Sequence, residues 1–368
     1  MPRLKVLLVG SGAEEQSIYN NLHKSNFIEK IYIAGKTKME SNSILYSDYD
    51  ELAQKALSLG IELVLVASEK DIFSGIVDIL ASYGLECIGT NRKYSRLASS
   101  KLFAKKFMDK YNILHPKTLS QDSEEYPLVI KHDEKYKLPP QIIYTNEEKK
   151  RISKEYKDNY FFEEYIAGEE LSVTSFYNGE CLTNFEPIKI NTNQFKYTGS
   201  SCPYFLSYEK YDKLQNYLTL LEHALLEDDA NFKGFITSNL IWKNNEWYVL
   251  SFGASSGEKQ TQTLLTHLES DLLSTLLYRT RQKYKEKTTA TIVVNYKVEQ
   301  QDLINSQKNE NIITCLSDIT SRQNKMLTLS TTADFPFKVL EKFADEMNLK
   351  FEYQKKIKQA KLFRNDNI

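Results

Sequence analysis

The alternation of strand and helix patterns over the first hundred residues constrains the fold more than any other feature. An apolar run, Lys5–Val9, ends at Gly10-Ser11-Gly12, and apolar residues at helical spacing follow it. Three further apolar runs follow with helical patterns between them: Ile31–Ala34, Ile61–Val66 and Leu85–Ile88. Strands that alternate with helices through short links predict a parallel, doubly wound sheet.

The pattern changes at Lys101, where an amphipathic helix, Lys101–Tyr111, begins. Short strands, a highly charged helix and a hairpin come after it, which is typical of an α+β arrangement. The further elements that we expect are helices at Ile72–Leu80, Glu147–Lys157, Tyr217–Leu226, Thr263–Arg279 and Phe337–Met347, a hairpin of Gly234–Trp242 with Glu246–Phe252, a strand at Ala290–Tyr296 and a polar loop at Gln301–Asn311.

Charge and cysteine usage exclude several classes of protein. The 368 residues include 48 Lys and Arg and 49 Asp and Glu, so the net charge is −1, whereas proteins that coat nucleic acid need an excess of cations. No apolar stretch is long enough to span a membrane, and the N-terminus lacks a signal-peptide pattern. We therefore expect a cytoplasmic protein without nucleic-acid or membrane partners. The four cysteines form no CxxC pair, so we expect neither a zinc site nor a disulfide framework.

The turn Gly10-Ser11-Gly12 follows a strand and opens a helix, where backbone N–H groups can bind a phosphate. A dinucleotide-binding pattern would need a glycine at position 15, but that residue is Glu15, whose carboxylate would repel phosphate. The same turn is equally compatible with a tight connection that binds no ligand. An enzyme that uses a nicotinamide cofactor is therefore not favoured.

Two lysines stand at positions that suit a polyphosphate clamp. Lys131 ends an apolar strand, and Lys101 opens a helix, where a cation opposes the helix dipole. Such a pair could hold the phosphates of a nucleotide. The competing interpretation is that both are ordinary surface lysines.

An acidic segment, Glu163–Glu170, connects two predicted strands. Its backbone groups could contact an adenine edge and its carboxylates could accept ribose hydroxyls, although it could equally be a solvated connection. The five histidines are scattered along the chain, and no GxSxG motif occurs. A serine or cysteine nucleophile with a histidine base is therefore not supported.

Taken in order, these fragments resemble the phosphoribosylamine–glycine ligases, a family of ATP-grasp enzymes in purine synthesis. The similarity extends over roughly residues 4–275. The stretches that carry it are Lys5–Gly12, Ala67–Asp78, Ser99–Met108, the nearly intact Glu163–Glu170, Gly234–Val249 and Glu269–Leu272. The resemblance implies a parallel-sheet N-terminal domain (1–98), a two-lobed ATP-grasp domain (99–285, with a lid lobe at about 117–170) and a small C-terminal domain (286–368).

The family's reaction joins glycine to 5-phosphoribosylamine at the expense of ATP, through a glycyl phosphate. By resemblance, Lys101 and Lys131 would face the ATP phosphates. The adenine would lie against Glu163, Glu164 and Ile166, with Glu170 near the ribose. The resemblance places the substrate region at Gly10, Gly12, Glu69, Thr198 and Gly199. No residue is assigned as catalytic.

Several stretches depart from the family's pattern. Ser251 and Gly253 stand where the family has a carboxylate and an amide that bind metal, so we expect magnesium binding to be weak or absent. The glycine-rich lid after Lys131 is replaced by a stretch without glycine. Three hypotheses therefore remain. The chain is an active ligase that uses glycine and phosphoribosylamine, or a non-catalytic ATP-grasp paralogue that binds a nucleotide or a protein. The third is an ATP-grasp ligase with other substrates, which would still need metal ligands. The protein would be a monomer or would have a partner that the sequence does not identify.

Overall fold

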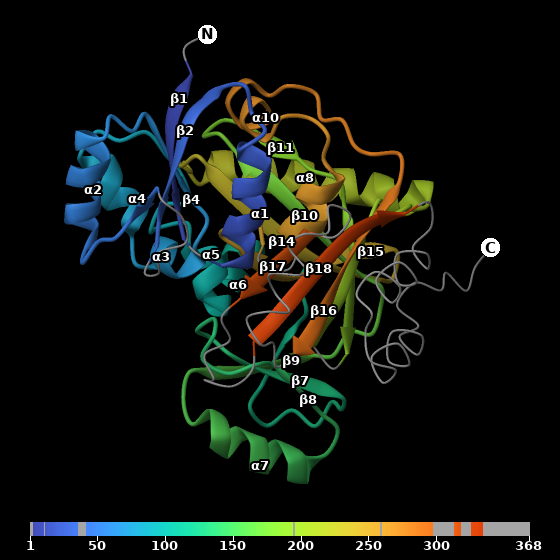
Figure 1. Cartoon of the computed structure of the whole chain (residues 1–368). Helices are drawn as coiled ribbons and strands as arrows, with labels where there is room; N and C mark the ends of the chain where they lie inside the picture. Colours follow the sequence, from blue (N-terminus) through green and yellow to red (C-terminus); the bar gives the residue numbers. More distant parts are fainter. Residues whose placement is uncertain are drawn as a thin grey trace.

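A computed structural model of the chain describes residues 3–10, 12–35, 42–193, 196–257, 260–296, 313–317 and 325–333 (Figure 1). The loop expected at 301–311 and the helix expected at 337–347 lie outside the described residues. Within them, three sheets form: one of five strands, one of four and one of nine.

The N-terminal domain contains the predicted parallel sheet, with the strand order β3-β2-β1-β4-β5. Alternate residues of β1 face opposite sides: Val6 and Leu8 pack towards α1, whereas Leu7 and Val9 pack towards α2 and α4. Such two-sided burial explains the continuous apolar run of β1. The elements are β1 (Leu4–Val9), α1 (Ala13–Leu22), β2 (Ile28–Ala34), β3 (Ser43–Ile44), α2 (Tyr49–Ser58), β4 (Leu63–Val66), α3 (Glu69–Phe73), α4 (Ile76–Ser82) and β5 (Cys87–Ile88).

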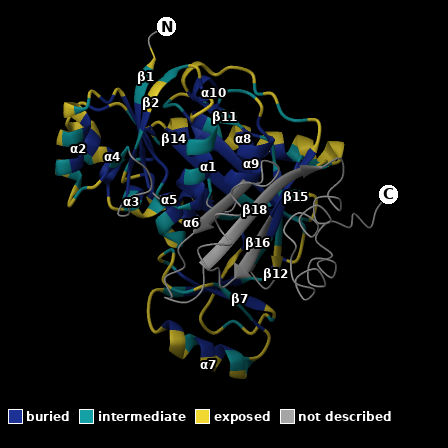
Figure 2. Cartoon of the chain, in the orientation of Figure 1, coloured by how far each residue is buried: buried dark blue, intermediate teal, exposed yellow. Residues whose placement is uncertain are grey.

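The lid lobe is a four-stranded antiparallel sheet of order β6-β9-β7-β8, with α7 on one face. Ile152 and Tyr156 of α7 are buried against Leu128, Ile130 and Phe162, while the outer side of the helix is exposed (Figure 2). The lobe comprises β6 (Thr118–Leu119), β7 (Leu128–His132), β8 (Gln141–Ile143), α7 (Asn146–Tyr156) and β9 (Tyr160–Glu164). It extends from the rest of the molecule (Figure 1).

The large sheet has the order β15-β14-β10-β12-β13-β16-β18-β17, with β11 paired to β10. The helix α8 covers one face together with α6, and α9 packs between the other face and the N-terminal domain. Its strands are β10 (Glu170–Tyr177), β11 (Leu182–Asn184), β12 (Ile188–Asn193), β13 (Lys196–Cys202), β14 (Gly234–Lys243), β15 (Glu246–Gly253), β16 (Thr288–Tyr296), β17 (Ile313–Ser317) and β18 (Lys325–Ala333). Its helices are α5 (Arg96–Ser99), α6 (Lys101–Lys110), α8 (Tyr208–Glu227), α9 (Thr261–His267) and α10 (Leu272–Tyr278).

Two expected helices are each divided in two. The stretch expected as one helix at 72–80 forms α3 and α4, because Gly75 between them has a φ of 85°. The stretch expected as one helix at 263–279 forms α9 and α10: Leu268 is extended, and the Asp271 side chain caps the next helix by accepting the Ser274 N–H. In both cases the helical spacing continues through the break, so periodicity alone did not reveal it.

The large sheet also includes strands from beyond residue 286. Gly199–Cys202 of β13 pair with β16, which in turn pairs with β18. The domain boundaries expected at 98/99 and 285/286 remain predictions. Among the described residues, no helix has both the length and the apolar character needed to cross a membrane.

Candidate functional site

The two predicted phosphate lysines lie near one another where the lid lobe meets α6 and the large sheet. Strand β7 pairs antiparallel with β9, so Lys131 stands opposite Phe161 and diagonally across from Glu163. This register places both side chains on one face of the lid sheet. Lys131 Nζ forms an ion pair with Glu163 and donates to the Leu250 carbonyl oxygen at 3.2 Å. The contact joins the lid lobe to β15.

A third lysine, Lys105, completes this cluster. Lys105 Nζ lies 3.0 Å from Glu163 Oε2 and 2.6 Å from the Pro116 carbonyl oxygen. Glu163 is therefore held between two buried ammonium groups. Sequence reasoning missed Lys105, although it lies one helical turn after Lys101 and carries a charge on the buried face of α6, a combination that could have revealed it.

Lys101 lies at the first turn of α6, beside a loop of the lid. Its Nζ donates to the His132 carbonyl oxygen at 2.7 Å. The loop is fixed by Asp133, which accepts hydrogen bonds from the Ser100 hydroxyl at 2.9 Å and the Leu102 N–H at 2.8 Å. Burial, and then the nearby Lys131 ammonium, lower the pKa of Lys101 to about 8. An anion bound here would favour the ammonium form of this lysine and raise its pKa again.

The predicted adenine segment forms the connection between the lid sheet and the large sheet. Glu164 ends β9 and pairs with Lys243 at 2.7 Å, Ile166 is buried, and Glu170 begins β10. The Thr192 hydroxyl donates to Glu170 at 3.3 Å. The Glu163 carboxylate pairs with Lys105 and Lys131, and the expected contact of this segment with adenine stays a prediction.

Glu69 lies at the start of α3 and contacts β15 and the lid loop. It pairs with Lys135 at 2.7 Å and accepts the Ala254 N–H at 2.9 Å. Although burial opposes the effect, the Lys135 ammonium lowers the pKa of Glu69 below its ordinary value. The carboxylate bridges the N-terminal domain, the lid and the large sheet.

The two positions where the resemblance places metal ligands do not fit magnesium. Ser251 offers a hydroxyl, which accepts a hydrogen bond from Asn239 Nδ2 at 3.1 Å. Gly253 offers no side chain, and a Cβ there would lie 3.2 Å from Glu69 Oε1. Magnesium prefers several oxygen ligands in octahedral geometry, usually including a carboxylate. These two positions supply neither the carboxylate nor the amide.

The turn at Gly10 and Gly12 encloses a carboxylate of the protein itself. The Gly12 N–H donates to Glu15 Oε2 at 2.7 Å, and a Cβ on Gly10 would overlap the Glu15 carboxylate. Next to it, Glu14 accepts the Ser256 hydroxyl at 2.6 Å and the Gly257 N–H at 3.0 Å. Burial, and next the Glu15 carboxylate, raise the pKa of Glu14 well above its ordinary value. This end of the site is acidic, a feature that sequence reasoning found only for Glu15.

Thr198 and Gly199 lie within β13. The Thr198 hydroxyl donates to the Asn191 carbonyl oxygen at 3.1 Å, and Gly199 is paired with both β12 and β16. These two residues, expected in the substrate region, are thus part of the sheet ladder.

Comparisons of sequence support the predicted resemblance. Residues 4–98 match the family model described as phosphoribosylglycinamide synthetase, N domain. The phosphoribosylamine–glycine ligase of Fusobacterium nucleatum subsp. nucleatum is 27% identical over 308 residues, which cover 74% of this chain and 72% of that protein. The enzyme of the same name from Caldanaerobacter subterraneus subsp. tengcongensis is 27% identical over 334 residues, which cover 81% of this chain and 78% of that protein.

Solved structures agree on the fold. An N5-carboxyaminoimidazole ribonucleotide synthetase in complex with ADP superimposes with a TM-score of 0.74 at 14% identity, covering 96% of this chain and 98% of that chain. The phosphoribosylamine–glycine ligase of Thermotoga maritima gives 0.71 at 16% identity, covering 94% and 96%. The predicted resemblance is therefore confirmed: this chain is similar in sequence to the phosphoribosylamine–glycine ligases and has the ATP-grasp fold.

Proposed function

We propose that this chain binds ATP between its lid lobe and large sheet and uses it to join glycine to 5-phosphoribosylamine, as its sequence relatives are named for doing. The observation that carries the proposal is the cluster of Lys101, Lys105 and Lys131 at the junction of the two lobes. Its support in sequence is a similarity that extends through most of the chain, well beyond residues 4–98.

The lysine cluster suits a polyphosphate. Lys101 and Lys131 would contact the ATP phosphates, since both lie at the lobe junction and the lowered pKa of Lys101 reflects cations gathered in a desolvated place. Phosphate oxygens would compensate that charge. The segment 163–166 would lie along the adenine and Glu170 near the ribose.

The bound ATP would supply the phosphoryl group that activates the glycine carboxylate. In the protein, the lysine ammonium groups would compensate the negative charge of the phosphates. Magnesium is given no role here, because Ser251 and Gly253 do not supply its ligands.

The amine substrate is assigned to the opposite end, at Gly10, Gly12, Glu69, Thr198 and Gly199. Near the first three of these residues the site is acidic, with Glu14 and Glu15 added. Carboxylates favour the amine group of this substrate and oppose its phosphate, so the phosphate would lie away from Glu14 and Glu15.

A second candidate is an ATP-grasp protein that binds nucleotide without ligation. Two observations favour it: the altered metal positions Ser251 and Gly253, and the buried Glu14 and Glu15 where a phosphate-bearing substrate would enter. Both candidates require nucleotide binding at the lysine cluster, and they differ only in turnover.

One experiment separates the two candidates. ADP release is measured from the purified protein with ATP, magnesium salt, glycine and phosphoribosylamine generated in situ, with the Fusobacterium relative as positive control. ATP binding is measured in parallel by calorimetry, with Lys131→Met as the variant that should lose it.

ADP release that needs both substrates establishes the ligase. ATP binding without ADP release establishes the second candidate. Absence of ATP binding in the wild type, while the control enzyme binds, overturns both.

A further inference from the structure

A group of three metal-ligand side chains outside the lysine cluster lies where α9 packs on the large sheet. Cys202 ends β13, His267 ends α9, and Glu186 lies in the connection between β11 and β12. Their ligand atoms all lie within 4.8 Å of one another. Neither the proposed reaction nor the family motifs use these residues.

We propose that Glu186, Cys202 and His267 bind one zinc ion, with water as the fourth ligand. Thiolate sulfur, imidazole nitrogen and carboxylate oxygen are the ligand types that zinc takes in proteins. The inference is independent of the proposed ligase function.

Two of the three ligand-atom distances in this group are close to those around a tetrahedral ion. Glu186 Oε2 lies 3.2 Å from His267 Nε2 and 3.6 Å from Cys202 Sγ. Zinc–nitrogen and zinc–oxygen bonds of about 2.0–2.1 Å and zinc–sulfur bonds of about 2.3 Å place tetrahedral ligands roughly 3.3–3.6 Å apart. The third pair, Cys202 Sγ and the His267 ring nitrogen, lies within 4.8 Å, so any larger side-chain adjustment on binding would fall on that pair.

The surroundings of His267 would hold the ring for metal binding. Its other nitrogen, Nδ1, lies 3.4 Å from the Thr289 hydroxyl, and Thr289 is the strand partner of Cys202. Its ring stacks on Tyr284, with centroids 5.5 Å apart. Tyr284 in turn accepts the Glu186 N–H at 3.1 Å. A partner on the second ring nitrogen is the usual support of a metal-binding histidine.

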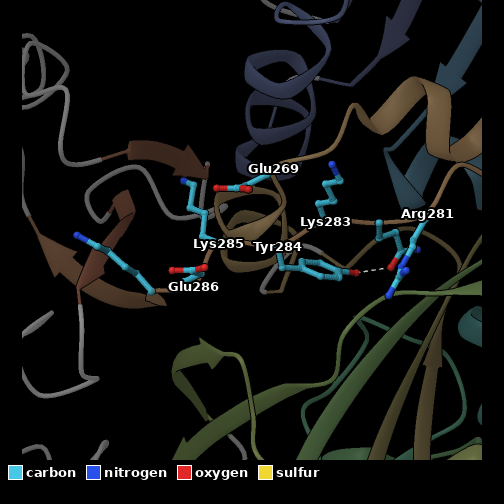
Figure 3. Close-up of a pocket in the computed structure, with 8 residues that line it drawn as sticks. Glu269, Arg281, Lys283, Tyr284, Lys285 and Glu286 are labelled. Carbon is cyan, nitrogen blue, oxygen red and sulfur yellow. Dashed lines mark hydrogen bonds between the residues drawn. The ribbon is translucent and has the colours of Figure 1, made fainter.

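The burial of the three side chains differs from one to another. Cys202 and His267 are buried, whereas the Glu186 side chain is 36% exposed. Tyr284 lines a cavity of about 710 Å³, with Glu269 and the segment 281–287 around it (Figure 3). The three ligands themselves do not line this cavity, so the partly exposed Glu186 carboxylate is the side of the group that faces solvent.

Without a cation, burial, and next the Glu186 carboxylate, raise the pKa of Cys202 well above its ordinary value. Zinc would bind as the Cys202 thiol loses its proton to solvent, which leaves the thiolate as the ligand. An ion here would tie α9 to β13 and to the connection before β12.

The test uses the full-length, untagged protein after treatment with a chelator, without nucleotide or substrates. Cobalt(II) is added as a spectroscopic probe and then displaced by zinc. We expect one cobalt per chain, a thiolate-to-cobalt charge-transfer band, displacement by zinc but not by magnesium, and a higher Tm with zinc.

The Cys202→Ser variant should lose the charge-transfer band and weaken zinc binding more than tenfold, and His267→Gln should weaken it similarly. Cys181→Ser is the matched control, because that thiol is half-buried and contacts only Asn178 Oδ1, at 3.5 Å, among the residues that the structure describes. Wild-type protein that shows no charge-transfer band, or a band that survives Cys202→Ser, overturns the proposal. The wild-type measurement decides even if a variant fails to fold.

Discussion

Glu163 and Glu14 are both buried glutamates, 2% and 5% exposed, yet their neighbours differ in charge. Glu163 lies between the ammonium groups of Lys105 and Lys131. Glu14 is held by the Ser255 and Ser256 hydroxyls and the Gly257 N–H, with Glu15 and Glu69 as like charges nearby. Ammonium groups therefore compensate the negative charge of Glu163, whereas only hydroxyl and N–H dipoles compensate that of Glu14.

Because of this difference, the end of the site near Glu163 and the end near Glu14 should bind ligands of opposite charge. The Glu163 end gathers more positive than negative charge, so it suits an anion such as a polyphosphate. The Glu14 end gathers carboxylates, so it opposes an anion and suits an amine. Substitutions that alter each glutamate and its neighbours test the contrast.

The largest expected effect is that of Glu163→Gln on stability. The amide keeps the shape of the side chain but leaves two ammonium groups buried without a counter-charge, which costs about 3–5 kcal/mol of unfolding free energy. Urea unfolding measures it. The control is Glu164→Gln, whose partly exposed pair with Lys243 is worth less than about 1 kcal/mol. Equal losses in the two variants would mean that Glu163 is no better compensated than its neighbour.

The next effect is that of Lys131→Met on ATP binding. Because Lys131 is a cation at the lobe junction, its loss should weaken ATP binding at least tenfold, which corresponds to about 1.4 kcal/mol or more of binding free energy. Calorimetry with Lys106→Met, an exposed lysine on α6, provides the control. Affinity that falls equally in both variants would indicate a general effect of charge rather than a binding site.

The pH dependence of ATP binding sharpens the assignment of Lys101. Since the pKa of Lys101 is about 8, the ammonium form that binds phosphate becomes scarce above that pH, and affinity should fall about tenfold between roughly pH 7 and 9. Lys101→Arg keeps its charge over this range, so its affinity should stay nearly constant. A wild-type profile as flat as that of the variant would remove Lys101 from the site.

The smallest effect is a gain of stability in Glu14→Gln. Because the folded-state pKa of Glu14 is raised, its charged form costs stability above the unfolded pKa, and the cost grows as the pH rises towards the folded value. The amide can keep the contacts with Ser256 and Gly257, so Tm near pH 7 should rise by roughly 2–4 °C, or about 1 kcal/mol. Near pH 4 the gain should vanish. A loss of stability at pH 7 would show that the dipoles compensate Glu14 fully.

Much of the fold was predictable because its patterns are local. The strands β1 and β4, the helix α6 and the hairpin β14–β15 all lie close to their predicted positions. The divided helices were missed since Gly75 and Leu268 interrupt the backbone without interrupting the apolar spacing. For the site, the ordered motifs pointed to Lys101 and Lys131 but not to Lys105 or Glu14.

The sequence by itself determined the parallel sheet and the family resemblance, because apolar runs and motifs can be recognised along the chain. That Ser251 and Gly253 stand at the family's metal positions stays a prediction. Tertiary structure decided which charges meet. Glu163 is paired with lysines from α6 and β7, and Glu14 with a segment some 240 residues away. Glu186, Cys202 and His267 likewise lie far apart in the sequence and form no motif there, so only the fold brings them together. Electrostatic interaction depends on distance and burial, which only the folded chain sets.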